Sequence, residues 1–307
     1  MSVIINLYKK NLLVRYDFDP AIPYYESKDF NKLRCEEDTF LNNHGNELHF
    51  FIYQYHPIKS NKTIIFLPGI GPGHRAYLKE INEFALQGYK VITLDYEGCG
   101  YSQGTFMSSI NQPTLDVLTL LSYLNLKGEV ILVGHSLGAY TALNVINKVN
   151  TIHKAVIMSG FLNVKYMMKS VLKSSLLASK IARYEESLNK EFKINNISYL
   201  NQTSNYILFV HSKDDPTAKY KYIIPKVKKM NNPHFSFLEV NGKRHNPNYT
   251  FEAVKYKDQI IETYFKKVNK GKFKNDEERK EYFKDVKLED LTTQDNEVLK
   301  KIFIYIG

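Results

Sequence analysis

The sequence predicts an α/β protein with a mostly parallel central sheet, helices on both faces and a helical insertion in its second half. Between residues 47 and 250, strand-like and helix-like segments alternate. The strand candidates are short, continuous apolar runs, which are typical of parallel strands covered on both faces. A long stretch with helical spacing interrupts this alternation after residue 160. These three observations set the expected architecture.

The expected elements follow one another from residue 47. ELHFFIYQY predicts a strand over 47–55, TIIFL predicts a buried strand over 63–67, and apolar spacing predicts a helix over 75–86. The other expected strands cover 90–94, 130–133, 155–158, 206–210 and 235–240, and the other expected helices cover 114–126, 136–149 and 251–267. In such sheets, functional residues gather where the strands have their carboxyl ends.

The segment between Gly160 and Tyr206 predicts an inserted cap. Its apolar side chains recur at helical spacing, namely at Phe161, Val164, Met167, Met168, Val171, Leu172, Leu176 and Leu177. One interpretation is a helix docked on the core. The other is a lid over an acyl pocket, with Phe161, Met167 and Met168 as candidate substrate contacts, because methionine adapts to varied apolar ligands.

These elements divide the chain into four parts. We expect an N-terminal segment over 1–46, a core over 47–160 and 205–268, a cap over 161–204, and a charged C-terminal extension over 269–307. The extension predicts a solvated helix followed by a short strand or a docking segment at KKIFIYIG.

Composition narrows the function classes. The 307 residues are 43% hydrophobic and 24% charged, which suits one large globular domain with a cap. The net charge of +10 mixes lysines with acids, as in NDEERKEYFKDVKLED, and no recognition motif accompanies it, so we expect no nucleic-acid partner. We find no signal-peptide pattern and no apolar run of about 18 residues that would span a bilayer. With only Cys35 and Cys99, we expect reduced thiols in a cytoplasmic protein.

The turn Gly134-His135-Ser136-Leu137-Gly138 stands between an expected strand and an expected helix. A serine hydroxyl becomes a nucleophile when a base and oxyanion donors lie within reach. G-x-S-x-G in this context lifts the hydroxyl above the sheet edge, while the glycines let the chains pack closely. It also puts the Leu137 N–H at a helix N-terminus, which favours an oxyanion. The motif by itself also fits a purely steric role for the glycines.

A glycine-rich loop, Pro68-Gly69-Ile70-Gly71-Pro72-Gly73-His74, follows the strand over 63–67. It matches neither phosphate-binding pattern, because no Lys-Ser/Thr follows and His74 interrupts G-x-G-x-x-G. We interpret it as the second half of an oxyanion hole, with the N–H of Ile70 or Gly71 facing the serine. A tight turn without a catalytic role is the alternative.

A general base is expected at His245. His153 and His234 stand at strand starts, the wrong end of a parallel sheet, and His211 ends an apolar strand, where a structural role is expected. His245 lies in NGKRHNP, just after the strand over 235–240, and therefore at the carboxyl end.

The base needs an orienting carboxylate. VHSKDDPTA ends the preceding strand and offers Asp214 and Asp215; the one that does not orient the base would be solvated or cap the following helix. We expect no metal site, since no ligand cluster supports His211 and these aspartates.

These pieces together resemble the α/β-hydrolase family over about residues 40–268. The resemblance rests on LPGIGPG, DYEGCGYSQG, GHSLG, HSKDDPTA and NGKRHNP, with serine, aspartate and histidine in the family's order. The register of the family's H-G-x-x-D motif implies Asp215 as the acid, although Ser212 replaces its glycine. Pro68-Gly69 stands where the family usually has His-Gly, which keeps the backbone donor, implies Ile70 as that donor, and leaves the family's histidine contact absent.

The intact GHSLG and the inserted cap are most similar to monoacylglycerol-lipase-like or small acyl-esterase members. The resemblance implies hydrolysis of a small-molecule acyl ester or thioester through an acyl-serine, without a metal or organic cofactor. Ser136 would be the nucleophile, His245 the base and then the acid, and Asp215 its orienter. An acyl-thioesterase or acyltransferase served by an acidic acyl carrier, and a non-catalytic binding protein of this fold, are the alternatives.

Overall fold

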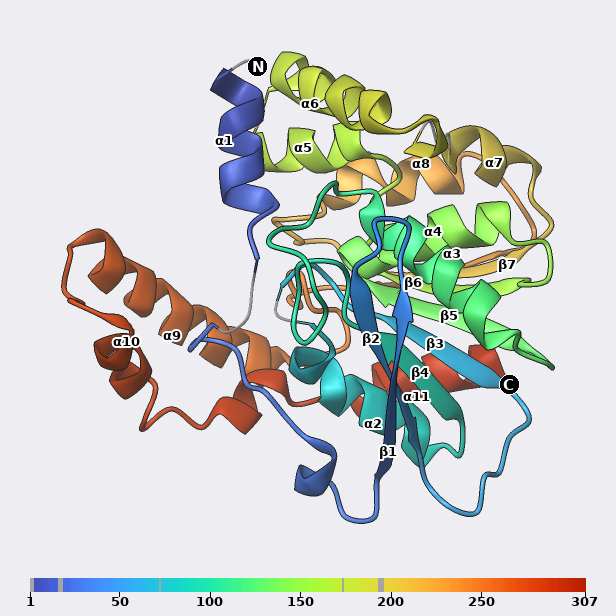
Figure 1. Cartoon of the computed structure of the whole chain (residues 1–307), viewed down its shortest axis with the longest axis horizontal. Coiled ribbons are helices and arrows are strands. Elements are labelled where there is room, and N and C mark those ends of the chain that lie inside the picture. The colour runs from blue at the N-terminus through green and yellow to red at the C-terminus, as the bar shows by residue number, and fades with distance from the viewer. Residues whose placement is uncertain (1–2, 16–18, 72, 173, 193–195) are drawn as a thin grey trace.

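One eight-stranded sheet forms the centre of the molecule, and helices cover both of its faces (Figure 1). The structure is a computed structural model that describes residues 3–15, 19–71, 73–172, 174–192 and 196–307. The strand order is β1-β2-β4-β3-β5-β6-β7-β8, with β2 antiparallel to both neighbours and the strands from β4 to β8 parallel. The predicted fold class, a mostly parallel sheet with helices on both faces, is confirmed.

The strands are β1 (Arg34–Leu41), β2 (Glu47–Gln54), β3 (Thr63–Leu67), β4 (Lys90–Leu94), β5 (Val130–His135), β6 (Lys154–Met158), β7 (Tyr206–Ser212) and β8 (Phe235–Val240). The helices are α1 (Val3–Leu12), α2 (Leu78–Leu86), α3 (Gln112–Leu124), α4 (Leu137–Lys148), α5 (Val164–Leu172), α6 (Ser175–Leu188), α7 (Asn196–Gln202), α8 (Ile224–Lys228), α9 (Phe251–Asn269), α10 (Asp276–Tyr282) and α11 (Asn296–Ile306). None of the helices in the described ranges has the length and apolar character needed to cross a bilayer.

Strand β3 shows why the apolar runs are continuous. Its side chains alternate between the two faces of the sheet, and all are buried. Ile65 and Leu67 pack in the core on the side of α3 and α4, whereas Ile64 and Phe66 pack in the core on the side of α2 and α11. Both faces are therefore covered, which explains why the run from Ile64 to Leu67 is apolar throughout.

The strands expected over 63–67, 90–94 and 235–240 are confirmed at those bounds, whereas the other five strands differ in extent or were not predicted. Strands β5 and β7 each run two residues further, because His135 and the pair His211-Ser212 remain in the ladder although their side chains are polar. Strand β1 was not predicted. Its sequence RCEEDTFL is mostly exposed at the sheet edge, so it lacks the apolar pattern and pairs with β2 through backbone groups.

The C-terminal segment corrects one expectation. KKIFIYI belongs to helix α11 and not to a strand, and it docks on the core, which was the second expected alternative. Asp295 caps the helix by accepting from the N–H groups of Glu297 and Val298. Its apolar face buries Val298, Leu299, Ile302 and Ile306, a helical spacing that a short terminal run concealed. The preceding charged stretch forms the solvated helix α10, which extends beside α9 away from the sheet in Figure 1.

Helices α5, α6 and α7 occupy the segment where the cap was expected, and α1 lies beside α5 and α6 (Figure 1). Glu185 of α6 is fully buried and accepts hydrogen bonds from the Tyr8 hydroxyl at 2.6 Å, the Ile110 N–H at 3.1 Å and the Asn111 side chain at 3.3 Å, as well as from Ser109. This carboxylate joins α1, α6 and the residues just before α3. Residues 173 and 193–195 of the expected cap, Pro72 of the glycine-rich loop, and residues 1–2 and 16–18 of the expected N-terminal segment lie outside the described residues.

Candidate active site

Ser136 stands in a sharp turn between β5 and α4, with φ 56° and ψ −114°. This left-handed backbone is strained for a serine and persists where the surroundings impose it. The Ser136 N–H donates to the Met158 carbonyl at 2.9 Å, which fixes the turn to the end of β6. The side chain is partly exposed at the carboxyl edge of the sheet.

The two glycines of the turn have a steric reason. A Cβ on Gly138 would lie 1.9 Å from the carbonyl oxygen of Leu67, and a Cβ on Gly134 would lie 2.3 Å from that of Gly138. Helix α4 therefore packs against the end of β3 more closely than any side chain would permit. The glycines make the strained turn possible, and the turn presents the serine.

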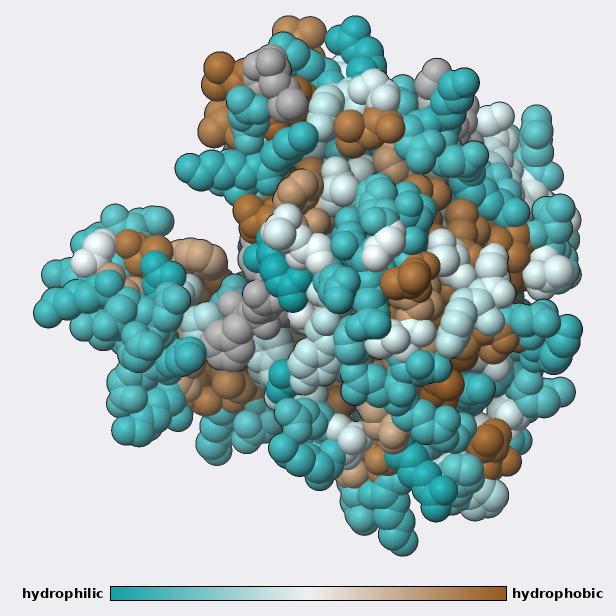
Figure 2. Space-filling view, viewed as in Figure 1, coloured by the Kyte–Doolittle hydropathy of each residue, from teal (hydrophilic) through white to brown (hydrophobic). Residues whose placement is uncertain are grey.

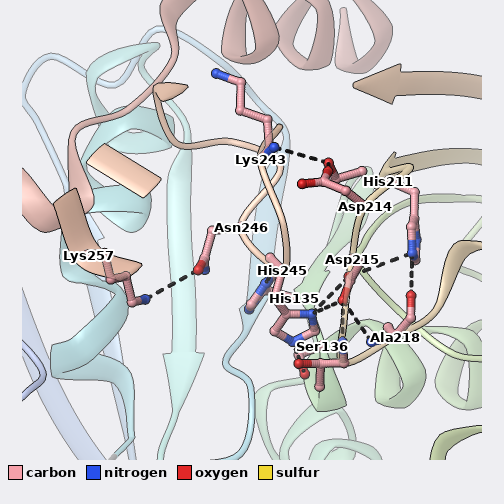
Figure 3. A network of polar contacts seen from close by, with 12 residues as sticks. His135, Ser136, His211, Asp214, Asp215, Ala218, Lys243, His245, Asn246 and Lys257 are labelled. Atoms are coloured by element: carbon pink, nitrogen blue, oxygen red, sulfur yellow. Dashed lines mark hydrogen bonds and ion pairs between the residues drawn. The ribbon is translucent and has the colours of Figure 1, made fainter. Parts of the chain in front are cut away.

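His245 and Asp215 lie beside Ser136 at the carboxyl ends of their strands (Figure 3). The Ser136 hydroxyl is 2.9 Å from His245 Nε2, and His245 Nδ1 is 2.9 Å from Asp215 Oδ2 and 3.1 Å from Oδ1. The structure thus brings the three residues expected from the sequence into one hydrogen-bonded chain. Each distance suits proton transfer or orientation of the imidazole.

Asp215 is held as a carboxylate. Its side chain is fully buried, which by itself disfavours the charge. The hydrogen bond and charge of His245, the charge of His211 and the Ala218 N–H outweigh burial and hold the pKa of Asp215 below its usual range. The N–H groups of Thr217 and Ala218 each donate to Oδ1 at 2.8 Å. These donors leave Oδ2 for the imidazole.

Asp214, the other candidate acid, points elsewhere. It is exposed and accepts from the Gly242 N–H at 3.0 Å and from the Ser212 hydroxyl. It therefore ties the loop that carries His245 to the end of β7, and does not cap a helix as one alternative expected. His211 has the structural position expected for it, because its Nε2 hydrogen donates to the Ala218 carbonyl at 2.6 Å.

His135, for which the sequence analysis predicted no role within GHSLG, connects three parts of the site. Its Nε2 lies 2.8 Å from the His245 carbonyl, so Nε2 carries the proton and Nδ1, 3.0 Å from the Tyr77 hydroxyl, accepts from it. Burial, and then the nearby His245, lower the pKa of His135 to about 3, which keeps it neutral. A motif match cannot reveal this, because the partners are 58 and 110 residues away.

The loop that carries His245 is also clamped by the C-terminal extension. Lys243 donates to Asp295 Oδ2 at 2.6 Å and to the Tyr249 carbonyl at 2.7 Å. The Asp295 N–H donates to the Asn248 carbonyl at 2.7 Å, and Thr250 pairs with Thr293. The C-terminal extension, for which the sequence analysis predicted no role, therefore helps to hold the loop that carries His245 in place.

Of the expected oxyanion residues, Leu137 follows Ser136 directly, and Ile70 lies in a loop close to it. Leu137 is the first residue of α4, so its N–H belongs to the unpaired donors of a helix N-terminus. A Cβ on Gly69 would lie 3.3 Å from the Ser136 Cβ, which puts the loop containing Ile70 against the serine. The later glycine Gly73 has a steric reason instead, because a Cβ there would lie 2.2 Å from the Asp95 carboxylate.

The three expected pocket residues differ in exposure. Phe161 is buried and stacks on Tyr140 with 4.8 Å between ring centroids. Met168 is also buried and lines a cavity between α1 and the cap, whereas Met167 is only partly buried. Their part in substrate binding stays a prediction. No group of three or more His, Cys, Asp or Glu in the described part of the chain is arranged to hold a metal ion.

Comparisons with known proteins concern the family and the fold of the chain. A family model described as serine aminopeptidase S33 matches residues 58–222, more than half of the chain. A comparison with curated proteins gives no match. Among solved structures, the Pyrococcus furiosus esterase Pf2001 is similar with a TM-score of 0.59 at 19% identity, over 81% of this chain and 95% of that chain.

Two further solved structures share the fold. A putative dipeptidyl aminopeptidase IV from Bacteroides ovatus has a TM-score of 0.55 at 14% identity, over 78% of this chain and 36% of that chain. The esterase RhEst1 from Rhodococcus sp. has a TM-score of 0.51 at 13% identity, over 76% of this chain and 98% of that chain. At these sequence identities, the similarity to the solved structures shows a shared fold alone.

Gly138→Ala tests the packing of the turn. We expect a loss of at least about 3 kcal/mol in the free energy of unfolding, because the new Cβ would overlap backbone that cannot move aside. The matched control is Gly45→Ala in an open turn at φ 75°, where nothing lies near the new Cβ; it should lose only about 1–2 kcal/mol of backbone strain. Denaturant unfolding measures both, and equal losses would contradict the steric account.

Proposed function

Since this chain belongs to the serine aminopeptidase S33 family of α/β hydrolases, we propose that it is a serine hydrolase that cleaves a carboxylic acyl ester through an acyl-serine intermediate. The observation that carries the proposal is the unbroken chain of hydrogen bonds from Ser136 through His245 to Asp215. A serine with a base on one side and a strained, partly exposed backbone position has the properties of a nucleophile.

In the acylation step, Ser136 Oγ attacks the acyl carbon while its proton passes to His245 Nε2. Asp215 keeps the Nδ1 proton in place and stabilises the imidazolium that forms. The N–H groups of Leu137 and Ile70 donate to the oxyanion of the tetrahedral intermediate. His245 then donates its Nε2 proton to the departing alcohol, which leaves the acyl group on Ser136.

Deacylation repeats these roles with water as the nucleophile. His245 takes a proton from the water, the hydroxide adds to the acyl carbon, and Ser136 leaves with the proton that His245 returns. Asp215 remains charged throughout. Tyr77 and His135 act on this cycle through the position of the His245 backbone and not through contact with the substrate.

We place the acyl ester ahead of an amide because the similar structures include the esterases Pf2001 and RhEst1. The family's description as serine aminopeptidase, and the putative dipeptidyl aminopeptidase among the similar structures, make an aminoacyl amide the second candidate. A thioester, or transfer to an acceptor other than water, would use the same three residues. We propose a reducing, cytoplasmic location because Cys35 and Cys99 are both free thiols.

A substrate panel tests the proposal. The wild-type chain should react with a fluorophosphonate probe and hydrolyse nitrophenyl esters faster than the matched thioesters and aminoacyl anilides. Ser136→Ala should remove labelling and lower kcat/KM by about 10³-fold or more. Ser159→Ala, another serine with a left-handed backbone at φ 47°, is the control and should retain both. Labelling that survives Ser136→Ala would overturn the assignment of Ser136 as the nucleophile. Turnover of an anilide or a thioester that is faster than turnover of the esters would make that compound class the proposed substrate.

The adjacent aspartates offer a matched pair. Asp215→Asn should lower kcat by about 10³–10⁴-fold with little change in folding, because the amide no longer holds the reactive tautomer of His245. Asp214→Asn should change kcat by less than about threefold, since the amide keeps an acceptor oxygen for Gly242. Steady-state kinetics on the best ester of the panel measures both, and similar losses in the two variants would contradict the role of Asp215.

A further inference from the structure

Large apolar side chains are exposed together on α1 and on the adjoining ends of α5 and α6. The exposed fractions are 74% for Val3, 55% for Leu7, 54% for Val171, 39% for Leu172 and 76% for Leu176. We name these five residues the α1–cap face. Single exposed apolar residues are ordinary, but a contiguous group marks a surface of interaction.

The face is continuous and hollowed. A cavity of about 320 Å³ opens between the three helices, lined by Leu7, Leu12, Met168, Leu172, Leu177 and Ile181 among others. Figure 2 shows brown, hydrophobic residues gathered over α1 and the neighbouring ends of the cap helices, at the upper left of the view. The lining also includes Tyr8 and Asn11, whose polar groups donate to Glu185 and to the Leu7 carbonyl, so the walls offer a hydrocarbon tail a mostly apolar surface.

The helices hold their positions without a partner. The Tyr8 hydroxyl of α1 donates to the buried Glu185 of α6 at 2.6 Å, and the Tyr8 ring meets Tyr184 edge-on at 6.5 Å. Because α1 is fixed to the cap by these contacts, the apolar side chains stay on the outside of a formed structure.

The charge of α1, α5 and α6 indicates which kind of partner fits the α1–cap face. The described residues of the three helices carry Lys9, Lys10, Lys165, Lys169, Lys180 and Arg183, whereas their acids are Glu185, which is buried, and Glu186. Lys165 and Arg183 line a separate cavity beside Glu186, which leaves Lys9, Lys10, Lys169 and Lys180 as the cations considered for the α1–cap face. Two copies of this chain would bring like charges together on such a face. A surface that is both apolar and anionic satisfies both features.

We propose that the α1–cap face docks on an anionic lipid bilayer. The apolar side chains enter the interfacial region, and the surrounding lysines contact lipid phosphates, as in amphipathic helices that lie on a membrane. The basic net charge of +10 adds a longer-range attraction to the same surface. Docking brings the cap, where we expect the acyl group to enter, against the lipid.

Vesicle binding tests this on the whole 307-residue chain, independently of any hydrolysis. We expect cosedimentation with vesicles of phosphatidylcholine and phosphatidylglycerol, at least about tenfold weaker binding to phosphatidylcholine alone, and loss of binding at 0.5 M salt, a concentration chosen because it screens charges beyond about 5 Å.

Two sets of variants locate the binding. Leu7→Ser/Leu172→Ser/Leu176→Ser should weaken binding to the anionic vesicles at least about tenfold, because each substitution removes hydrocarbon that docking would bury in the bilayer. The matched control is Leu41→Ser/Leu86→Ser/Ile304→Ser, three residues exposed by 64%, 50% and 71% on other elements. Lys10→Glu/Lys180→Glu should weaken binding by about fivefold or more per lysine, and Lys300→Glu/Lys301→Glu on α11, with the same net charge, should not.

Thermal unfolding confirms that each variant is folded before its binding is compared. Equal binding to neutral and anionic vesicles, no binding to either, or equal losses in the matched controls would overturn the proposal. So would light scattering that shows a dimer abolished by the leucine variant, since the occupant would then be a second copy. Binding of an acidic acyl carrier protein through this face, in the absence of vesicle binding, would assign the face to a protein instead.

Discussion

The left-handed backbone at Ser136 is the constraint on which the arrangement of the site depends. It costs roughly 1–3 kcal/mol in a non-glycine residue, so the surrounding packing must impose it. Gly134 and Gly138 permit that packing, because they let α4 approach the end of β3 to distances that a Cβ would block. The same approach brings the loop of Gly69 and Ile70 against the serine. One steric solution therefore orders both the proposed nucleophile and the proposed oxyanion loop.

The remaining parts of the site are positioned by hydrogen bonds between loops that are distant in sequence. His135 connects the turn to the backbone of His245 and, through Tyr77, to the helix that follows the glycine-rich loop. Lys243 and Asp295 connect the loop of His245 to the C-terminal extension. Asp215 can remain charged in a buried site because donors surround it. Local strain and long-range ties together hold the imidazole between the serine and the carboxylate.

Much of this could be predicted from the sequence, because buried parallel strands and a G-x-S-x-G turn leave local patterns. The bounds of β3, β4 and β8, and the positions of Ser136 and His245 at strand ends, follow from such patterns. Other features have no local signal. Strand β1 is polar at an exposed edge, α11 hides a helical spacing in a short terminal run, and the partners of His135 and Lys243 are set by the tertiary fold. The choice of Asp215 over Asp214 as the acid required the register of the family's motif, because the two residues are adjacent in the sequence.

Direct observation of the acyl-enzyme is the measurement closest to the central claim. A slowly deacylating ester mixed with the protein and quenched in acid within milliseconds to seconds would preserve the intermediate for peptide mapping by mass spectrometry. We predict a mass increase equal to the acyl group on the peptide that contains Ser136, forming at the rate of the alcohol burst and decaying at the steady-state rate. Ester turnover without any acylated peptide, or acylation at another residue, would contradict nucleophilic catalysis by Ser136.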